Sequence, residues 1–360
     1  MGAAGARARP QRLTALRILA AAFAAGLLGS AIWRFRRRRI TRLNLLISSA
    51  IALALGLLSV APGLFDPVFD FFDFQRGGGQ RLLAVLIFGN IVLLLLVLRT
   101  MSETDQVRRD FKVLMEWMGR QTFDQERAEG LPAGDRIVVV LPAFNEADSV
   151  GEVLDQMPEK IDGHPVVPLV VDDASEDATA GVARAHGALV TSLPIRRGGG
   201  QAMRVGYELA LRLGAVVVAS LDADGQHLPQ ELPDVVGPIL RDEADMVQGS
   251  RMLGSYQKES RIRHLGVLFF SGLVSLMTGT RLTDVSNGYR ATRADTLRTF
   301  FLDEDQFWTS EILIEGLRHR ARIVEVPITV LARKHGQTKK PRPLKYGWSF
   351  LKVIMKTWLR

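Results

Sequence analysis

Three apolar stretches dominate the first hundred residues of the chain. Residues 43–65 and 82–98 contain no charged side chain, whereas residues 18–33 form a shorter, alanine-rich stretch. An α-helix of about 20 apolar residues is long enough to cross the hydrocarbon core of a bilayer. The pattern therefore predicts a membrane domain in residues 1–100 with two or three transmembrane helices, the first of which either crosses the bilayer or lies in its plane.

Two further segments mix apolar and charged side chains in the manner of amphipathic helices. Residues 101–134 begin with such a helix, which carries Phe111 and Trp117, and end in a polar linker that contains glycine and proline. Residues 341–360 interleave lysines with aromatic and aliphatic side chains such as Trp358. We expect both helices to lie on a membrane surface.

Strand-like and helix-like segments alternate in residues 135–340. The pattern predicts strands over 136–141, 166–171, 215–221 and 245–249, and helices over 149–157, 178–186 and 201–213. Uninterrupted apolar runs of this kind are typical of parallel strands that are covered on both faces. The alternation predicts a Rossmann-like α/β domain whose mostly parallel sheet is flanked by helices.

The formal net charge of +8 is unevenly distributed. Residues 1–42 contain ten arginines and residues 333–360 contain nine lysines or arginines, both without an acidic residue, so that +8 less 19 leaves −11 for the rest. Six of the arginines lie between the first two apolar stretches, while three aspartates lie between residues 66 and 73. The positive-inside rule therefore predicts a multi-pass plasma-membrane protein with its α/β domain in the cytoplasm.

Two classes of partner and chemistry follow from the composition. Basic blocks beside membrane-facing segments favour membrane lipids as partners, and no nucleic-acid-binding motif accompanies them. The chain has no cysteine, which excludes disulfides, thiolate catalysis and cysteine-ligated zinc.

The most informative motif follows the apolar run 215–219. Asp222, Asp224 and Gln226 offer oxygen ligands at alternate positions, directly after a predicted buried strand. Open α/β sheets bind ligands at the carboxyl ends of their strands. Hard oxygen ligands of this kind suit Mg²⁺ or Mn²⁺ shared with a diphosphate, although a lone Asp-x-Asp can also be a polar turn.

Three other groups of polar residues follow predicted strands. Residues 142–146 read PAFNE, Asp172 and Asp173 follow an apolar run, and residues 196–200 read RRGGG. Carboxylates there can accept hydrogen bonds from a base or ribose, and a glycine-rich loop lets the backbone approach a ligand. Taken singly, each group is also compatible with a turn or a helix cap.

In order and spacing, six motifs resemble the family 2 glycosyltransferases of the GT-A fold, and most closely the polyprenyl-phosphate sugar synthases such as dolichyl-phosphate mannose synthase. The resemblance covers roughly residues 135–339. The motifs are PAFNE (142–146), VVDDASEDAT (170–179), DADGQH (222–227), GSR (249–251), DVSNGYRA (284–291) and RKHGQTK (333–339). The N-terminal part resembles a small membrane domain that is found fused to such transferases.

The resemblance implies roles for named residues. The nucleoside is held by Pro142, Phe144, Glu146, Val171 and Asp173. Asp222 and Ala223 contact ribose and diphosphate, and Asp224 with Gln226, next to Asp222, binds the divalent cation. We expect Arg251, Arg333 and Lys339 to neutralise the departing diphosphate, together with the cation.

The implied reaction is an inverting transfer of one sugar from a GDP- or UDP-linked donor to a polyprenyl phosphate at the cytoplasmic face. Arg261, Arg263 and Arg290 are candidate ligands of the acceptor phosphate. A phosphate acceptor is already ionised and needs no general base.

Two alternatives stay open from the sequence. The acceptor can be a hydroxyl of a lipid-linked saccharide in cell-envelope polysaccharide assembly, in which case Asp284 is the candidate base; its other role would be to orient Arg290 or to brace its loop. A nucleotide-binding membrane scaffold without turnover is the non-enzymatic alternative. The Gln-x-x-Arg-Trp motif of processive synthases is absent, which disfavours chain elongation.

Overall fold

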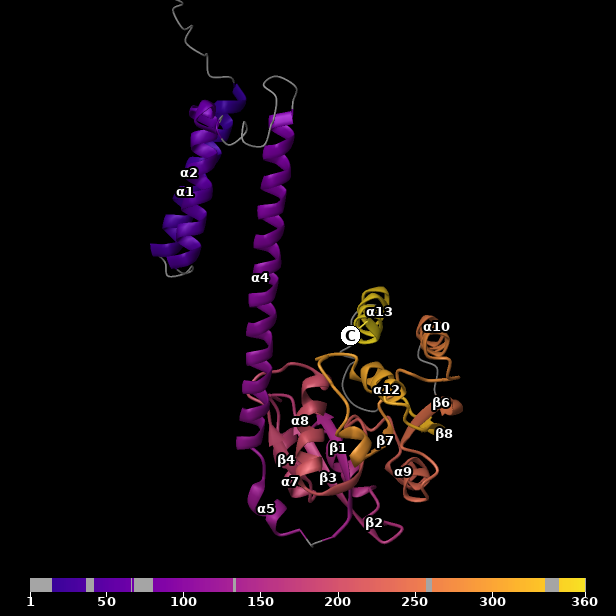
Figure 1. Ribbon diagram of the computed structural model, residues 1–360. Helices are drawn as coiled ribbons and strands as arrows, with labels where there is room; N and C mark the ends of the chain where they lie inside the picture. Colours follow the sequence, from indigo (N-terminus) through magenta and orange to yellow (C-terminus); the bar gives the residue numbers. More distant parts are fainter. Residues whose placement is uncertain are drawn as a thin grey trace, which may run out of the picture. The chain divides into compact units, whose positions relative to one another are not determined.

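The computed structural model describes residues 15–36, 42–65, 67, 80–131, 134–256, 261–333 and 343–359. The chain divides into two compact units, Met1–Thr104 and Asp105–Arg360 (Figure 1). The long helix α4, Gln80–Gln121, contributes its first part to one unit and its second part to the other.

The first unit contains two helices that pack on each other, α1 (Ala15–Arg36) and α2 (Arg42–Val60), followed by the short 3-10 helix η1 (Pro62–Phe65). Small side chains such as Ala24 and Ala52 are buried, whereas large apolar ones such as Phe23 are exposed. The prediction of two or three transmembrane helices in residues 1–100 is not supported, because none of the helices within the described ranges combines the length and the apolar character that crossing a bilayer requires.

The second unit is built on an eight-stranded sheet. Its strands are β1 (Arg136–Ala143), β2 (Lys160–Ile161), β3 (His164–Asp172), β4 (Leu189–Ser192), β5 (Ala215–Ser220), β6 (Met246–Tyr256), β7 (Arg290–Arg293) and β8 (Ile323–Val330). The order is β2-β3-β1-β5-β7-β6-β8, with β4 paired to β3. Only β2 and β7 run antiparallel to their neighbours, so the prediction of a mostly parallel sheet is confirmed.

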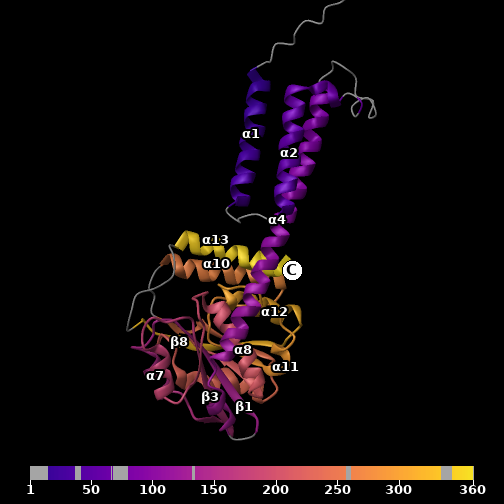
Figure 2. The same ribbon diagram turned by 90° about the vertical axis from the view of Figure 1, so that its left-hand side faces the viewer.

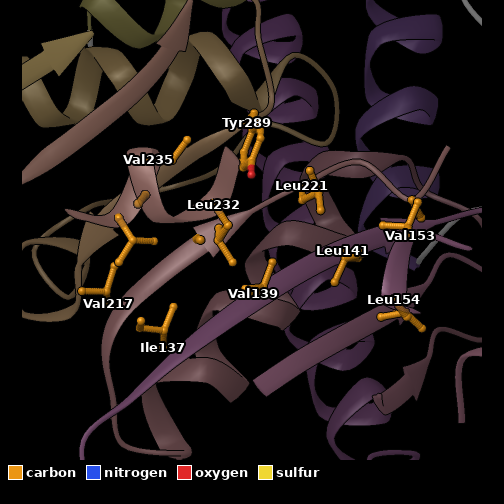
Figure 3. Close-up of a cluster of buried hydrophobic side chains, with 14 of the residues drawn as sticks. Ile137, Val139, Leu141, Val153, Leu154, Val217, Leu221, Leu232, Val235 and Tyr289 are labelled. Atoms are coloured by element: carbon orange, nitrogen blue, oxygen red, sulfur yellow. The ribbon is translucent and has the colours of Figure 1, made fainter. Parts of the chain in front are cut away.

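Helices cover both faces of this sheet. Successive residues of β1 point to opposite faces. Ile137, Val139 and Leu141 therefore pack against α6 (Val150–Asp155), α7 (Thr179–Ala185) and α9 (Leu232–Leu240), which follows the 3-10 turn η2 (Pro229–Glu231) (Figure 3). Val138 and Val140 join the core under α8 (Gly199–Arg212) and α12 (Trp308–Arg318). The short helices α5 (Gln125–Glu129) and α11 (Ala294–Leu297) complete the unit.

The register of the parallel strands gathers the predicted motifs at one edge. Ala143 of β1 lies opposite Asp172 of β3, which lies opposite Ser192 of β4, and Val140 lies opposite Ser220 of β5. The loops after β1, β3, β4 and β5 therefore leave the sheet at the same edge, as expected for a ligand site of this fold class.

The two predicted amphipathic helices form, as the second part of α4 and as α13 (Pro343–Leu359), and each packs one face against the rest of the second unit, to which both belong. In α4, Met115 is buried, and Gly119 lies so close to Leu193 and Val205 that an added Cβ would be 3.1 Å from both. The helix α13 lies beside α10, Arg261–Thr278 (Figure 2). The ring of Phe350 in α13 is in edge contact with those of Phe270 and Phe307, with centroid separations of 4.7 and 5.3 Å.

Candidate functional site

The loops that follow β1 and β3 are tied to each other by hydrogen bonds. Asn145 adopts a left-handed conformation (φ 51°), and its backbone N–H donates to Ser175 Oγ at 2.9 Å. Its side-chain oxygen accepts the N–H of Glu176 at 2.8 Å. The N–H of Glu146 donates to Thr179 Oγ1 at 2.9 Å. These bonds fix the backbone from which the Glu146 carboxylate reaches into the site.

Asp173 organises the glycine-rich loop before α8. Its side chain is buried, and its two oxygens accept the backbone N–H groups of Arg197 at 2.9 Å and Gly198 at 2.7 Å. Burial raises the pKa of Asp173, and the two hydrogen bonds offset that effect only in part. A carboxylate oxygen has two lone pairs, so each oxygen can accept one more hydrogen bond from a base or ribose.

The residues expected to hold the nucleoside line the same edge. The guanidinium of Arg196 lies 3.7 Å from the centroid of the Phe144 ring. Pro142 is half-buried and is paired with Val171 across β1 and β3. Val171 is completely buried in this structure.

The predicted metal ligands lie in the turn after β5. Asp222 is partly exposed, whereas Ala223 and Asp224 are buried. Asp224 Oδ1 accepts the N–H of Gln226 at 3.1 Å, across the left-handed Gly225 (φ 72°). The Gln226 side-chain amide nitrogen donates to the carbonyl of Leu331 at 3.1 Å, so that the amide oxygen is not used in this bond.

A single guanidinium joins two carboxylates at the centre of the site. Arg333 forms an ion pair with Glu146 at 3.2 Å and another with Asp224 Oδ2. Ser149 Oγ donates to the carbonyl of Ala223 at 3.0 Å and also contacts a Glu146 carboxylate oxygen at 3.1 Å. Burial alone would lower the pKa of Arg333, but the two carboxylates outweigh it and the net pKa is raised.

Arg251 and Asp284 form a second ion pair. Arg251 Nε donates to Asp284 Oδ2 at 2.6 Å, and Ser286 Oγ donates to the other carboxylate oxygen at 3.1 Å. The Asp284 side chain is completely buried. In this structure Asp284 orients Arg251 and, through Ser286, braces its own loop. Its assignment as a general base for a hydroxyl acceptor stays a prediction.

Arg290 is buried instead of facing an acceptor. Its guanidinium donates to the carbonyls of Thr309, at 2.7 Å, and of Asn287, and lies 5.1 Å from the Trp308 ring. Burial lowers the pKa of Arg290 to about 10. The expected contact with an acceptor phosphate does not fit this burial, and the residue fastens the loop that precedes it. The side chains of Arg261 and Arg263, at the start of α10, and the whole of Lys339 lie outside the described residues.

Gly288, Trp308 and His227 lie near Asp222. His227 shares the motif DADGQH with Asp222, whereas the approach of Gly288 and Trp308 was not predicted from the sequence. A Cβ on Gly288 would lie 3.2 Å from a carboxylate oxygen of Asp222 and 3.5 Å from the Trp308 ring. His227 is buried, with its Nδ1 3.9 Å from Asp222. The glycine in SNGYR was a usable signal for close approach, whereas nothing near Trp308 in the sequence pointed to the site.

The oxygen ligands fit a cation that is shared with a substrate. No cluster of three histidines, cysteines or acids suited to a metal occurs in the part of the chain that the structure describes. Mg²⁺ bound with a nucleotide, however, takes only one or two protein carboxylates and completes its shell with phosphates and water. Asp224, Asp222 and Gln226 supply two carboxylates and an amide oxygen, which suffices for such an ion.

Comparisons with known proteins identify the family of the α/β domain. Residues 138–301 match the model of the family "Glycosyl transferase family 2". An undecaprenyl-phosphate mannosyltransferase of Micrococcus luteus is 33% identical over 215 residues, which are 57% of this chain and 87% of the relative. A dolichyl-phosphate hexose transferase of Haloferax volcanii is 30% identical over 230 residues, 62% of this chain and 95% of the relative.

A solved structure gives the same assignment of the fold. Glucosyl-3-phosphoglycerate synthase of Mycobacterium tuberculosis, in complex with Mn²⁺, UDP and glucosyl-3-phosphoglycerate, is similar with a TM-score of 0.50 at 23% identity, over 62% of this chain and 80% of that one. With the curated relatives, this likeness confirms the GT-A-like α/β fold. The chain belongs to glycosyl transferase family 2, and it is a glycosyltransferase.

Proposed function

We propose that this glycosyltransferase moves one sugar from a nucleotide-sugar donor to a polyprenyl phosphate, with inversion at the anomeric carbon. The observation that carries the proposal is the meeting of Asp224, Glu146 and Arg333 at the carboxyl ends of β1 and β5, beside Asp222. The carboxylates can bind a divalent cation, and the guanidinium can bind the diphosphate that shares this cation. The names of the two curated relatives, which act on undecaprenyl and dolichyl phosphate, support a lipid phosphate as the acceptor.

The chemistry requires stabilisation of a departing nucleoside diphosphate. Mg²⁺ or Mn²⁺, held by Asp224, Gln226 and Asp222, would neutralise the diphosphate oxygens. Arg251, which Asp284 holds in place, adds a second positive charge. Asp173 and Phe144 hold the nucleoside end of the donor, so that the anomeric carbon lies over the turn after β5. The structures of the synthase with UDP and Mn²⁺ support both a divalent cation and a UDP donor, whereas a mannosyltransferase name leaves GDP open.

The burial of Asp284 favours a phosphate over a hydroxyl acceptor. A hydroxyl nucleophile needs a base to take its proton, and a polyprenyl phosphate is already an anion. Asp284, the base candidate from the sequence, is completely buried and paired with Arg251. We therefore keep the hydroxyl of a lipid-linked saccharide only as the second candidate.

The proposal includes attachment to the cytoplasmic face of the plasma membrane, where such a lipid acceptor is embedded. Large apolar side chains are exposed on α10 and α13, the adjacent helices of the second unit: Ile262, Leu265, Leu268, Phe269, Leu276, Trp348, Met355, Trp358 and Leu359. Lys352 lies 5.6 Å from the Trp348 ring, which adds a positive charge beside the exposed apolar surface. Apolar side chains next to lysines are typical of helices that rest on anionic membranes.

The test is a transfer assay with the purified full chain. GDP-mannose, UDP-glucose and UDP-N-acetylglucosamine are each supplied with undecaprenyl phosphate in detergent, with Mn²⁺ or with a chelator. We expect one donor to give a lipid-linked monosaccharide and free nucleoside diphosphate, and the chelator to abolish both. A parallel reaction supplies a lipid-linked saccharide as the acceptor. Transfer to that saccharide but never to undecaprenyl phosphate would contradict the proposal and favour the second candidate.

A further inference from the structure

The ion pairs of Arg333 lie where a metal ion would bind. The Arg333 side chain is 20% exposed, and those of its partners Glu146 and Asp224 are 12% and 9% exposed. Two carboxylates held this close in a half-buried site need a compensating positive charge. In this structure the guanidinium of Arg333 supplies it.

Both oxygens of Asp224 are engaged. Oδ1 accepts the N–H of Gln226 at 3.1 Å within the turn made by Gly225, and Oδ2 accepts a guanidinium N–H of Arg333. The first bond belongs to the fold of the turn. A cation that binds Asp224 through Oδ2 would lie beside the positive charge of Arg333, and the repulsion between the two favours displacement of the guanidinium from that oxygen.

We propose that Arg333 stands in for the divalent cation at Asp224 and yields this position when the cation and the diphosphate arrive together. The Arg333 guanidinium then moves onto the diphosphate, while Glu146 keeps its hold on the other guanidinium nitrogen. This inference rests on the proposed function, and it makes Glu146 a positioning residue for Arg333.

The backbone around Arg333 supports a movement of the side chain alone. Leu331 donates its N–H to the carbonyl of Gln226 at 2.8 Å, and Val330 pairs with His227. Two residues before Arg333, the chain is therefore tied to the same turn that carries Asp224. Glu146 is held in turn by the contact of its carboxylate with Ser149 Oγ at 3.1 Å.

The consequence is that the divalent cation and the nucleotide donor bind cooperatively. Without a diphosphate, a cation at Asp224 costs Arg333 one of its two anionic partners and leaves it paired with Glu146. With the diphosphate present, Arg333 exchanges one anion for another. By linkage, the cation and the nucleoside diphosphate raise each other's affinity by the same factor.

Mn²⁺ binding to the full chain without nucleotide tests the inference directly, by electron paramagnetic resonance of the free ion. We expect Arg333→Gln to bind Mn²⁺ about three- to tenfold more tightly than the parent, the range of one charge-assisted hydrogen bond in a partly buried site. Arg196→Gln is the matched control, because it removes an arginine at the edge of the site that contacts Phe144 and not Asp224. It should leave the Mn²⁺ affinity within about twofold of the parent.

The second measurement is the factor by which UDP or GDP, whichever binds the parent, raises Mn²⁺ affinity. This factor should fall in Arg333→Gln, because the diphosphate no longer gains the arginine when the metal enters. Arg333→Lys keeps the charge without the forked geometry and should lie between the two. If Arg333→Gln binds Mn²⁺ no better than the parent, or if Arg196→Gln gains equally, the inference is wrong.

Two controls distinguish a change in metal affinity from a change in folding and from a failure of the proposed sugar transfer. Thermal unfolding should give a larger Mn²⁺-induced rise of the midpoint in Arg333→Gln than in the parent, since the ion replaces the missing charge in a folded site. The sugar-transfer assay on the parent tests the proposed function by itself. A parent that transfers sugar while Arg333→Gln gains no metal affinity overturns only the role of Arg333.

Discussion

At the scale of single residues, the site is governed by how its carboxylates are paired. Asp173 is paired with backbone N–H groups, Asp224 with a guanidinium and a backbone N–H, and Asp284 with Arg251. Asp173 and Asp224 follow strands, whereas Asp284 lies between α10 and β7. Most of their partners come from distant segments of the chain, so the sequence did not predict the burial that distinguishes Asp284.

The pairing of Asp284 predicts the effect of Asp284→Asn. The substitution keeps the shape of the side chain but removes the charge that fixes Arg251. We therefore expect kcat/KM for sugar transfer to fall by about tenfold, which is less than the loss expected if Arg251 itself were removed. The free energy of unfolding should fall by about 1–3 kcal/mol, because a charged hydrogen-bond acceptor is lost inside the protein. Steady-state rates and chemical denaturation measure the two effects.

The control and the contrary result for this prediction are well defined. Asp295→Asn makes the same chemical change in an exposed pair, with Arg298, and should leave both quantities unchanged. A positioning role leaves the pH dependence of the rate as in the parent. Loss of an entire limb of the pH–rate profile in Asp284→Asn would instead identify Asp284 as the general base.

At the scale of helices and strands, the sequence predicted those elements that a local pattern of apolar and polar residues marks. The strands β1, β3 and β5 are apolar runs, and each was predicted to within two residues at either end, whereas only the first part of β6 was predicted, because the strand continues to Tyr256 through a polar stretch. The strand β7 is only four residues long and reads RATR, so no local pattern marks it. It exists because it fits antiparallel between β5 and β6, which is a long-range contact.

The glycine-rich loop before α8 is a second case in which distant contacts explain local sequence. The N–H of Gly200 donates to the carbonyl of Asp305 at 2.9 Å, and a Cβ at this position would lie 2.1 Å from the carbonyl oxygen of Glu304. The acidic segment 303–305 is itself held by cations from three helices, Lys112, Arg204 and Lys356. The glycines of this loop therefore allow close packing against residues 303–305, in addition to any close approach of a ligand.

Gly200→Ala should accordingly separate α8 from the acidic segment. A methyl group inside a tight backbone contact forces the two chains apart, and we expect the free energy of unfolding to fall by about 1–3 kcal/mol. Gly181→Ala is the matched control, because Gly181 lies in α7 with no atom within 4 Å of an added Cβ. That change should be neutral or stabilise by up to about 1 kcal/mol, as alanine favours a helix. Equal unfolding midpoints in urea for the two variants would contradict the packing argument.

At the scale of the whole molecule, the catalytic unit combines an ion site with an apolar surface. Trp348 and Trp358 on α13 are 60% and 42% exposed, although Phe350 and Ile354 of the same helix are buried. The sequence predicted the helix and its amphipathic character. It did not predict that the buried face would pack on α10 and α12, because helical periodicity marks an apolar face without naming its partner.

The exposed face of α13 leads to a prediction about acceptor length. If this face rests on the bilayer, replacing Trp348 and Trp358 together by alanine should raise the KM for undecaprenyl phosphate in anionic vesicles by about tenfold or more. The variant lacks the two large side chains whose transfer from water into the bilayer would stabilise membrane binding. Transfer to a short-chain, water-soluble polyprenyl phosphate should keep the parent's kcat and KM, since the ion site is untouched.

Val324→Ala, which shortens an exposed apolar side chain on β8, is the control and should behave as the parent with both acceptors. An equal loss with both acceptors would mean that the tryptophans support the fold, and an unchanged KM in vesicles would show that α13 does not bind the membrane.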